Sequence, residues 1–230
     1  MPTILNIIQT LLLLAHTHFV LPSPLPLPTP QDQEPPTTSC PAITIISVRG
    51  ATEYPGEGRL GTLAGDIGNA SENTQRIALD YPAELFPYYS SVLSGIRTLT
   101  DLLNGSSAAC PDTKFVLMGY SEGAHVIGDT LCGGLLTREI DSVIGGKVAA
   151  IIFMADPRHV ANEPINVGTA SRNGLFPRPS FNSCSNYYSR MKSYCDAGDW
   201  VCDSGLNRDV HSAVVEKYRA VAVAFVNGLL

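Results

Sequence analysis

A serine between two glycines, in the segment Gly119-Tyr120-Ser121-Glu122-Gly123, is the feature of this sequence with the clearest chemical meaning. The apolar run 115–118 precedes it, and residues 124–131 can form a helix behind it. A strand, a tight turn with small residues and a helix are what a nucleophile elbow requires, because the strained turn exposes the serine hydroxyl. The alternative is a strand-to-helix turn with an incidental serine. The context favours Ser121 as a catalytic nucleophile.

A serine hydroxyl needs an imidazole that accepts its proton, and the chain offers five histidines. His16 and His18 fall in or beside an apolar N-terminal stretch, and His125 lies one helical turn after the serine, facing the sheet or solvent. His159 follows an apolar run and has a simpler interpretation as a loop residue. His211 lies just before the last predicted helix and gives the chain order Ser, Asp, His that is typical of the elbow. We therefore predict His211 as the general base.

Two aspartates could hold that histidine, Asp156 and Asp199. Asp199 lies between Cys195 and Cys202, and a disulfide between them would close a small rigid loop around the carboxylate. Asp156 precedes a proline and can simply end a strand. We predict Asp199 as the acid, and we expect the aspartates beside the cysteines to be solvated: Asp196 and Asp203.

The oxyanion of an acyl-transfer reaction requires two hydrogen-bond donors. The N–H of Glu122, directly after the nucleophile, is the first candidate. The second donor must come from the loop after the first predicted strand, where residues 49–53 place the N–H of Ala51.

The composition indicates a buried core and excludes nucleic acid as a partner. Hydrophobic residues make up 44% of the 230 residues and charged residues 16%. The formal net charge is -6, and no run of Lys and Arg could neutralise phosphates.

The N-terminus has the composition of a secretion signal. The apolar stretch 4–15 is too short to cross a bilayer, and no second apolar span follows it, so residues 1–20 are predicted to be a signal peptide without a stable membrane anchor. A buried core helix is the alternative. Residues 21–38 form a Pro-rich lead-in, and residues 39–230 are expected to be one domain of a secreted, extracellular protein, by default a monomer.

Secretion predicts oxidised cysteines. Six cysteines allow fifteen pairings. A metal site is disfavoured because no Cys-x-x-Cys occurs and no histidine is spaced with a cysteine pair. We expect disulfides, no metal and no cofactor. The cysteines are Cys40, Cys110, Cys132, Cys184, Cys195 and Cys202.

Apolar runs that alternate with helical patterns predict an α/β fold. The runs 43–48, 115–118 and 148–154 have the composition of buried strands, and residues 49–68 are predicted to be a glycine-rich loop. Apolar residues from 92 to 103 recur at helical spacing, with a stop expected at Asn104-Gly105, and residues 214–226 present one apolar face. This alternation predicts a mainly parallel sheet with helices on both faces.

Two sequences match the N-glycan acceptor pattern, at Asn69 and Asn104. The pattern often occurs by chance, but it fits surface positions of a secreted chain.

From Cys40 onward the chain resembles the cutinase and acetylxylan esterase family. The matching segments are 39–43, 49–58, 80–83, 119–124, 131–134, 153–158, 176–179 and 193–199. The resemblance implies a lid-free, cutinase-like α/β-hydrolase, a three-layer sandwich with the triad Ser121, Asp199 and His211. It also implies the disulfides Cys40–Cys110, Cys132–Cys184 and Cys195–Cys202.

The chain departs from the family at the expected oxyanion hole. The family usually has serine or threonine where Ala51 stands, whose hydroxyl adds a donor, and glutamine where Glu122 stands. The missing hydroxyl predicts weaker catalysis unless Thr52 replaces it. An ionised Glu122 side chain pointing inward would oppose the developing anion.

Two loops point to different ester substrates. The polar segment 205–210 before His211, with the tract 187–202, is more similar to acetylxylan esterases, and favours removal of acetyl groups from plant polysaccharide. The segment 84–89 contains Leu85, Phe86 and two tyrosines, and could form an apolar lip for cutin or short-chain lipid esters. An inert secreted scaffold with the same fold is the third alternative.

Overall fold

The computed structural model describes residues 39–70 and 72–230. The predicted signal peptide and Pro-rich lead-in lie outside the described residues. In the part that is described, no helix is both long and apolar enough to cross a membrane.

The described residues build a six-stranded sheet in which every neighbouring pair is parallel, with the order β2-β1-β3-β4-β6-β5. The strands are β1 (Ile43–Val48), β2 (Thr74–Ala78), β3 (Lys114–Tyr120), β4 (Val148–Met154), β5 (Asn166–Val167) and β6 (Met191–Tyr194). The strand order reverses between β1 and β3, and open parallel sheets bind ligands beyond the carboxyl ends of the strands at such a reversal. The loops after β1 and β3 are therefore expected to form the site.

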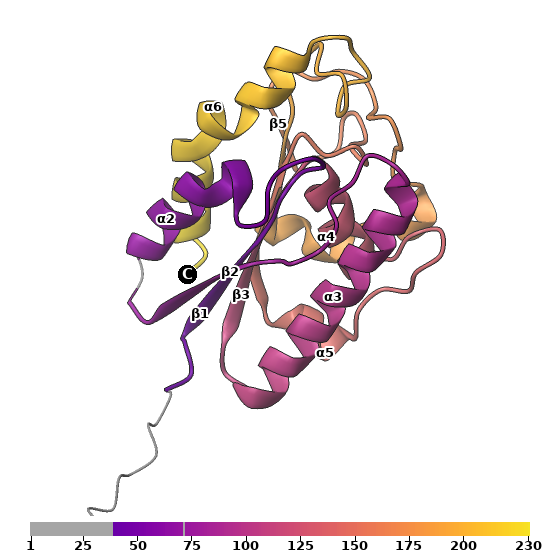
Figure 1. Cartoon of the computed structure of the whole chain (residues 1–230). Coiled ribbons are helices and arrows are strands. Elements are labelled where there is room, and N and C mark those ends of the chain that lie inside the picture. Colours follow the sequence, from indigo (N-terminus) through magenta and orange to yellow (C-terminus); the bar gives the residue numbers. More distant parts are fainter. Residues whose placement is uncertain (1–38, 71) are drawn as a thin grey trace, which may run out of the picture. The chain divides into compact units, whose positions relative to one another are not determined.

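Helices cover both faces of the sheet, as the sequence predicted (Figure 1). Helices α2 (Gly61–Asn69) and α6 (Arg208–Asn227) lie on one face, and α3 (Tyr88–Ala109), α4 (Glu122–Cys132) and α5 (Ser142–Gly146) lie on the other. Three short 3-10 helices complete the elements: η1 (Gly58–Leu60), η2 (Ser180–Asn182) and η3 (Ser185–Arg190).

Strand alternation divides the core into two layers. In β3, Phe115 and Leu117 pack toward α3 and α4, whereas Val116 and Met118 pack toward α2 and α6. All four side chains are fully buried, which is why this strand reads as a continuous apolar run. Burial on both faces holds the central strands, and hence the loops at their carboxyl ends, in fixed positions.

Several predicted boundaries were wrong. Helix α3 continues through Asn104 and Gly105 to Ala109, because Leu103 and Ser107 still face the core. The predicted loop 49–68 contains helix α2, whose Leu63, Ala64 and Ile67 are buried against the sheet. Val221 was assigned to the apolar face of the last helix but is 54% exposed. Strands β2, β5 and β6 were not predicted.

The described residues contain three disulfides: Cys40–Cys110 and Cys132–Cys184 join segments distant in the sequence, and Cys195–Cys202 closes a short loop. These are the pairs that the family resemblance implied. Both glycan candidates are exposed, Asn69 at the end of α2 and Asn104 on α3, although Ser71 of the first acceptor pattern lies outside the described residues.

Candidate active site

Ser121 occupies a strained turn between β3 and α4. Its backbone has φ 52° and ψ -117°, a region that side chains rarely adopt, and its N–H donates to the Met154 carbonyl at 2.8 Å. Two residues after Ser121, a glycine is required at position 123, because a Cβ there would lie 1.9 Å from the Val48 carbonyl oxygen. The strand, turn and helix thus have the geometry of a nucleophile elbow, which projects the hydroxyl beyond the sheet.

A continuous hydrogen-bonded chain links the three residues that the sequence analysis singled out. His211 Nε2 lies 3.1 Å from Ser121 Oγ, and His211 Nδ1 lies 3.0 Å from each carboxylate oxygen of Asp199. The Asp199 side chain is fully buried and His211 is 7% exposed. This arrangement can remove a proton from the serine and stabilise the imidazolium that forms.

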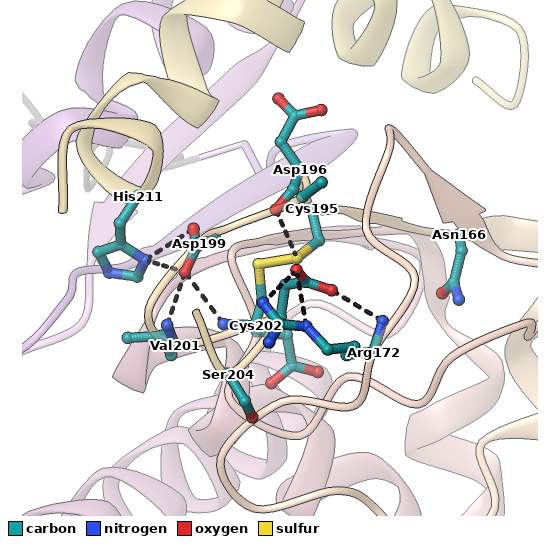
Figure 2. The surroundings of a disulfide bond; sticks show 12 residues. Asn166, Arg172, Cys195, Asp196, Asp199, Val201, Cys202, Ser204 and His211 are labelled. Carbon is teal, nitrogen blue, oxygen red and sulfur yellow. Dashed lines mark hydrogen bonds and ion pairs between the residues drawn. A yellow bond between two sulfur atoms is a disulfide. The ribbon is translucent and has the colours of Figure 1, made fainter. Parts of the chain in front are cut away.

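The loop between β6 and α6 fixes the carboxylate of Asp199 (Figure 2). Oδ1 accepts the N–H of Val201 at 2.7 Å and that of Cys202 at 3.0 Å. The Asp199 carbonyl accepts the N–H of Gly205 at 2.7 Å, and the Cys195–Cys202 disulfide closes the loop. Backbone donors and a covalent link therefore hold the acid where regular secondary structure is absent.

The neighbouring aspartates are buried, which corrects the prediction that they are solvated. Asp203 is 1% exposed and binds Arg172 at 3.1 Å, and Asp196 is 7% exposed and binds Lys217 at 2.5 Å (Figure 2 labels Arg172 and Asp196). Burial alone would raise the pKa of Asp203, but hydrogen bonds from the Gly198 N–H and from Arg172 hold it below its usual value. Both carboxylates therefore brace the loop that carries Asp199.

His211 lies in the first turn of α6, not before the helix as predicted. Asn207 caps the helix by accepting the N–H groups of residues 209 and 210 at 2.9 and 3.2 Å. The His211 imidazole lies close to two aromatic rings. Its ring centroid is 5.1 Å from that of Tyr120 and 5.7 Å from that of Trp200. Burial raises the pKa of Tyr120, so this ring stays neutral beside the base.

The other candidates for base and acid point elsewhere. His125 is fully buried, with Nε2 3.2 Å from Asp129 and Nδ1 3.0 Å from the Tyr88 hydroxyl. His159 is buried, and burial lowers its pKa. Asp156 is buried and accepts a backbone N–H two residues further along the chain. Among the described residues, the side chains of these three make no hydrogen bond to the side chain of Ser121 or of His211.

The loop after β1 carries Ala51, whose N–H is the expected second oxyanion donor, to the same site as Ser121. Glu53 fixes the turn, since its Oε2 accepts the Gly50 N–H at 2.7 Å. Ala51 and Ser121 line the same two surface hollows. Glu122 begins α4, so its N–H is one of the donors that a helix leaves without an internal acceptor. The two expected oxyanion donors therefore come from loops at the sheet reversal.

Ala51→Ser is expected to raise kcat for ester hydrolysis by up to about tenfold, less than the loss caused by deleting an existing oxyanion donor. The added hydroxyl would supply a third donor to the oxyanion. Steady-state kinetics on p-nitrophenyl acetate would measure it. Thr52→Ala is the matched control, because it tests whether the Thr52 hydroxyl already donates. An unchanged or lower kcat in Ala51→Ser would contradict the prediction.

Two hollows meet at Ser121. The first, of about 260 Å³, we call the polar hollow; the second, of about 200 Å³, we call the apolar hollow. The polar hollow is lined by Glu53, Arg59, Arg208, His211 and Ser212. The apolar hollow is lined by Tyr88, Pro157, Leu175, Phe176 and Val201. Both also include Ala51, Leu85 and Trp200.

Sequence reasoning missed several of these lining residues. Trp200 directly follows Asp199 and is the only tryptophan of the chain, a signal that could have placed it at the site. Leu175 and Phe176 precede a proline in a segment without regular structure, and nothing in their local pattern indicates that they reach Ser121. The segments expected near the site were the lip at residues 84–89, the oxyanion loop 49–53 and the polar segment 205–210.

The parallel sheet, the strained serine turn and the Ser-His-Asp chain define the class of α/β-hydrolases. The family model described as Cutinase matches residues 39–230. Acetylxylan esterase of Hypocrea jecorina is 35% identical over 206 residues, 83% of this chain and 68% of that protein. Cutinase 11 of Verticillium dahliae is 32% identical over 207 residues, 84% of this chain and 70% of that protein. The chain belongs to the cutinase family and is a carboxylic-ester hydrolase.

A solved structure agrees with this assignment. The catalytic core domain of acetyl xylan esterase from Trichoderma reesei aligns with a TM-score of 0.77 at 33% identity. The alignment covers 84% of this chain and 100% of that one. The three-layer, cutinase-like α/β architecture predicted from the sequence is therefore confirmed.

Proposed function

We propose that this esterase removes acetyl groups from plant polysaccharide through an acyl-enzyme on Ser121, with His211 as base and Asp199 as its orienting acid. The observation that carries the catalytic roles is the hydrogen-bonded chain from Asp199 through His211 to Ser121 Oγ, at the junction of two hollows.

The geometry supports a two-step reaction. His211 Nε2 takes the proton of Ser121 as Oγ attacks the ester carbonyl, and the N–H groups of Ala51 and Glu122 stabilise the oxyanion. The intermediate collapses when the imidazolium gives its proton to the departing alcohol. Water, deprotonated by the same imidazole, then attacks the acyl-enzyme and releases acetate and free serine.

This proton transfer indicates which part of the ester would occupy each of the two hollows. The departing alcohol must receive its proton from His211 Nε2, so it occupies the polar hollow, which His211 lines. The acyl group occupies the apolar hollow, which His211 does not line.

The polar hollow favours a sugar as the alcohol. Glu53, Arg59 and Ser212 offer hydrogen-bonding groups for hydroxyls, and Trp200 offers an aromatic face beside them. These groups suit a polysaccharide better than an aliphatic polyester, whose alcohol would gain from apolar contacts.

A cutinase-like activity is the second candidate, and two observations favour it. The apolar hollow of about 200 Å³ exceeds what one methyl group fills. Phe86 is 90% exposed and Leu85 is 55% exposed at the rim, where they could contact an apolar surface.

The test compares acetate release from acetylated xylan with hydrolysis of p-nitrophenyl acetate, butyrate and palmitate. The control is the same enzyme inactivated by an organophosphonate, which reacts only with an activated serine. We expect phosphonate-sensitive activity on xylan and on the acetate ester. A preference for butyrate or palmitate would favour the cutinase-like activity. Absence of hydrolysis would support the inert scaffold. Hydrolysis that the phosphonate does not block would do the same, because it would not depend on an activated serine.

We also propose that the protein is secreted and acts as a single-domain monomer. Three disulfides favour an oxidising compartment. Recovery from culture medium, with glycan mapping at Asn69 and Asn104, tests secretion, and light scattering tests the oligomeric state.

A further inference from the structure

Glu122 is a buried carboxyl group whose own N–H belongs to the proposed oxyanion hole. It begins α4 and is 1% exposed. Among the described residues, neither of its side-chain oxygens has a hydrogen-bond partner of good geometry, and no cation forms an ion pair with it. An ionised carboxylate in such surroundings is costly, because burial removes its hydration and nothing replaces it.

The nearest cation cannot supply the missing ion pair. Arg49 donates through Nε to the Glu53 carbonyl at 3.1 Å and through Nη1 to the Leu79 carbonyl at 3.1 Å. Its Nη2 donates to the Tyr81 carbonyl. The guanidinium is thus engaged with backbone carbonyls of the oxyanion loop and of the segment before α3, where it has a structural role.

The other groups that face Glu122 do not favour its charge strongly. The Ser91 hydroxyl of α3 lies nearby and accepts the Glu84 N–H at 3.0 Å. The Tyr81 hydroxyl donates to the Arg49 carbonyl, and Glu84 adds a second negative charge. Burial raises the pKa of Glu122 to about 7, against smaller opposing effects of Ser91 and Arg49. Tyr88, the remaining titratable neighbour, is kept neutral by burial, which raises its pKa.

We propose that Glu122 takes part in ester hydrolysis as a neutral carboxylic acid, and that its ionisation weakens the adjacent oxyanion hole and lowers the rate at alkaline pH. The proposal rests on the proposed function, because it needs the oxyanion that forms at Ser121.

The physical effect is a charge that opposes the transition state. The ester is neutral when it binds, whereas the tetrahedral intermediate carries a negative oxygen beside the Glu122 N–H. A buried carboxylate on the same residue repels that oxygen at a low effective dielectric constant, and so raises the barrier more than it weakens substrate binding. The charge state of the Glu122 side chain therefore sets how strongly the hole stabilises the oxyanion.

The experiment is the pH dependence of kcat/KM for phenyl acetate, followed by acetate release from pH 5 to 9. In the wild type we expect a fall of about tenfold on the alkaline side, with its midpoint near the pH at which Glu122 ionises. Glu122→Gln, normalised to its own maximum, should lack this fall because the amide cannot ionise. Glu84→Gln is the matched control: it removes the exposed neighbouring carboxylate and should keep the alkaline fall.

A second readout does not depend on catalysis. A raised pKa in the folded state means that, between about pH 4.5 and pH 7, the folded protein holds a proton that the unfolded chain has lost. The stability contributed by this proton is fully present below about pH 4.5 and is lost as the pH rises through 7. When the pH is raised from 4.5 to 8.5, the urea concentration at the unfolding midpoint should therefore decrease more in the wild type than in Glu122→Gln.

The outcomes separate the two proposals. An alkaline fall shared by the wild type and Glu122→Gln, or urea midpoints that move in parallel, would overturn the role of Glu122 while leaving the esterase intact. Absence of hydrolysis at every pH would overturn the proposed function and, with it, this inference.

Discussion

Asp199→Asn is expected to lower kcat about 10⁴-fold, the size of the effect of this change in other Ser-His-Asp sites. The structure supplies the reason. Oδ1 accepts two backbone N–H groups, from Val201 and Cys202, so the amide oxygen must take that position. The amide NH2 is then turned toward His211 Nδ1. A donor there forces the proton onto Nε2, and the imidazole can no longer accept the proton of Ser121.

Asp203→Asn is the matched control for this prediction. Asp203 lies in the same loop and is also buried, but it binds Arg172 and backbone N–H groups and makes no bond to the imidazole. We expect Asp203→Asn to have a lower free energy of unfolding than the wild type and a kcat of the same order of magnitude. Single-turnover acylation with p-nitrophenyl acetate would measure both variants. If Asp199→Asn kept kcat within about tenfold of the wild type, Asp199 would not be the orienting acid.

Removal of the Cys40–Cys110 disulfide is expected to lower the free energy of unfolding by about 4 kcal/mol and to leave kcat unchanged. The two cysteines are 70 residues apart in the sequence, and a crosslink stabilises by restricting the unfolded chain in proportion to the logarithm of the loop it closes. The bond lies at the amino-terminal ends of β1 and β3, opposite the end that carries Ser121. Urea titration of the double alanine variant would measure the loss.

The Cys195–Cys202 pair is the counterpart. It spans 7 residues, so its removal should lower the free energy of unfolding by about 2 kcal/mol. Because it closes the loop that carries Asp199, kcat should fall even where the protein is fully folded. The opposite ranking, with the long crosslink affecting kcat and the short one only stability, would show that the Asp199 loop is held by its hydrogen bonds alone.

The positions of the predicted site residues could be argued from the sequence because each depends on short-range features. A buried strand before Ser121 and small residues around it specify the turn locally. Parallel strands carry their carboxyl ends to one edge, so the loops after β1 and β3 had to meet. The order Ser, Asp, His then selected His211, and the short loop between Cys195 and Cys202 selected Asp199 over Asp156. Their catalytic roles remain predictions.

What could not be predicted depends on contacts distant in sequence. Asn104-Gly105 is a local helix stop, but packing of Ser107 and the disulfide at Cys110 extend α3 past it. Asp203 has the local appearance of a surface residue. Its burial depends on Arg172, which is 31 residues away in the sequence. Leu175 and Phe176 are held at the site by backbone hydrogen bonds to Val201 and Pro157, which are distant in the sequence.

The turn at Ser121 imposes a trade-off on this protein's evolution. A non-glycine residue at φ 52° stores roughly 1–3 kcal/mol of backbone strain, which the buried sheet and helices must offset. Glycine would relieve that strain, yet it would remove the proposed nucleophile. Selection for a more durable enzyme must therefore act on other positions. If Ser121 is the nucleophile, as proposed, this turn trades stability for catalysis, and directed stabilisation should leave it untouched.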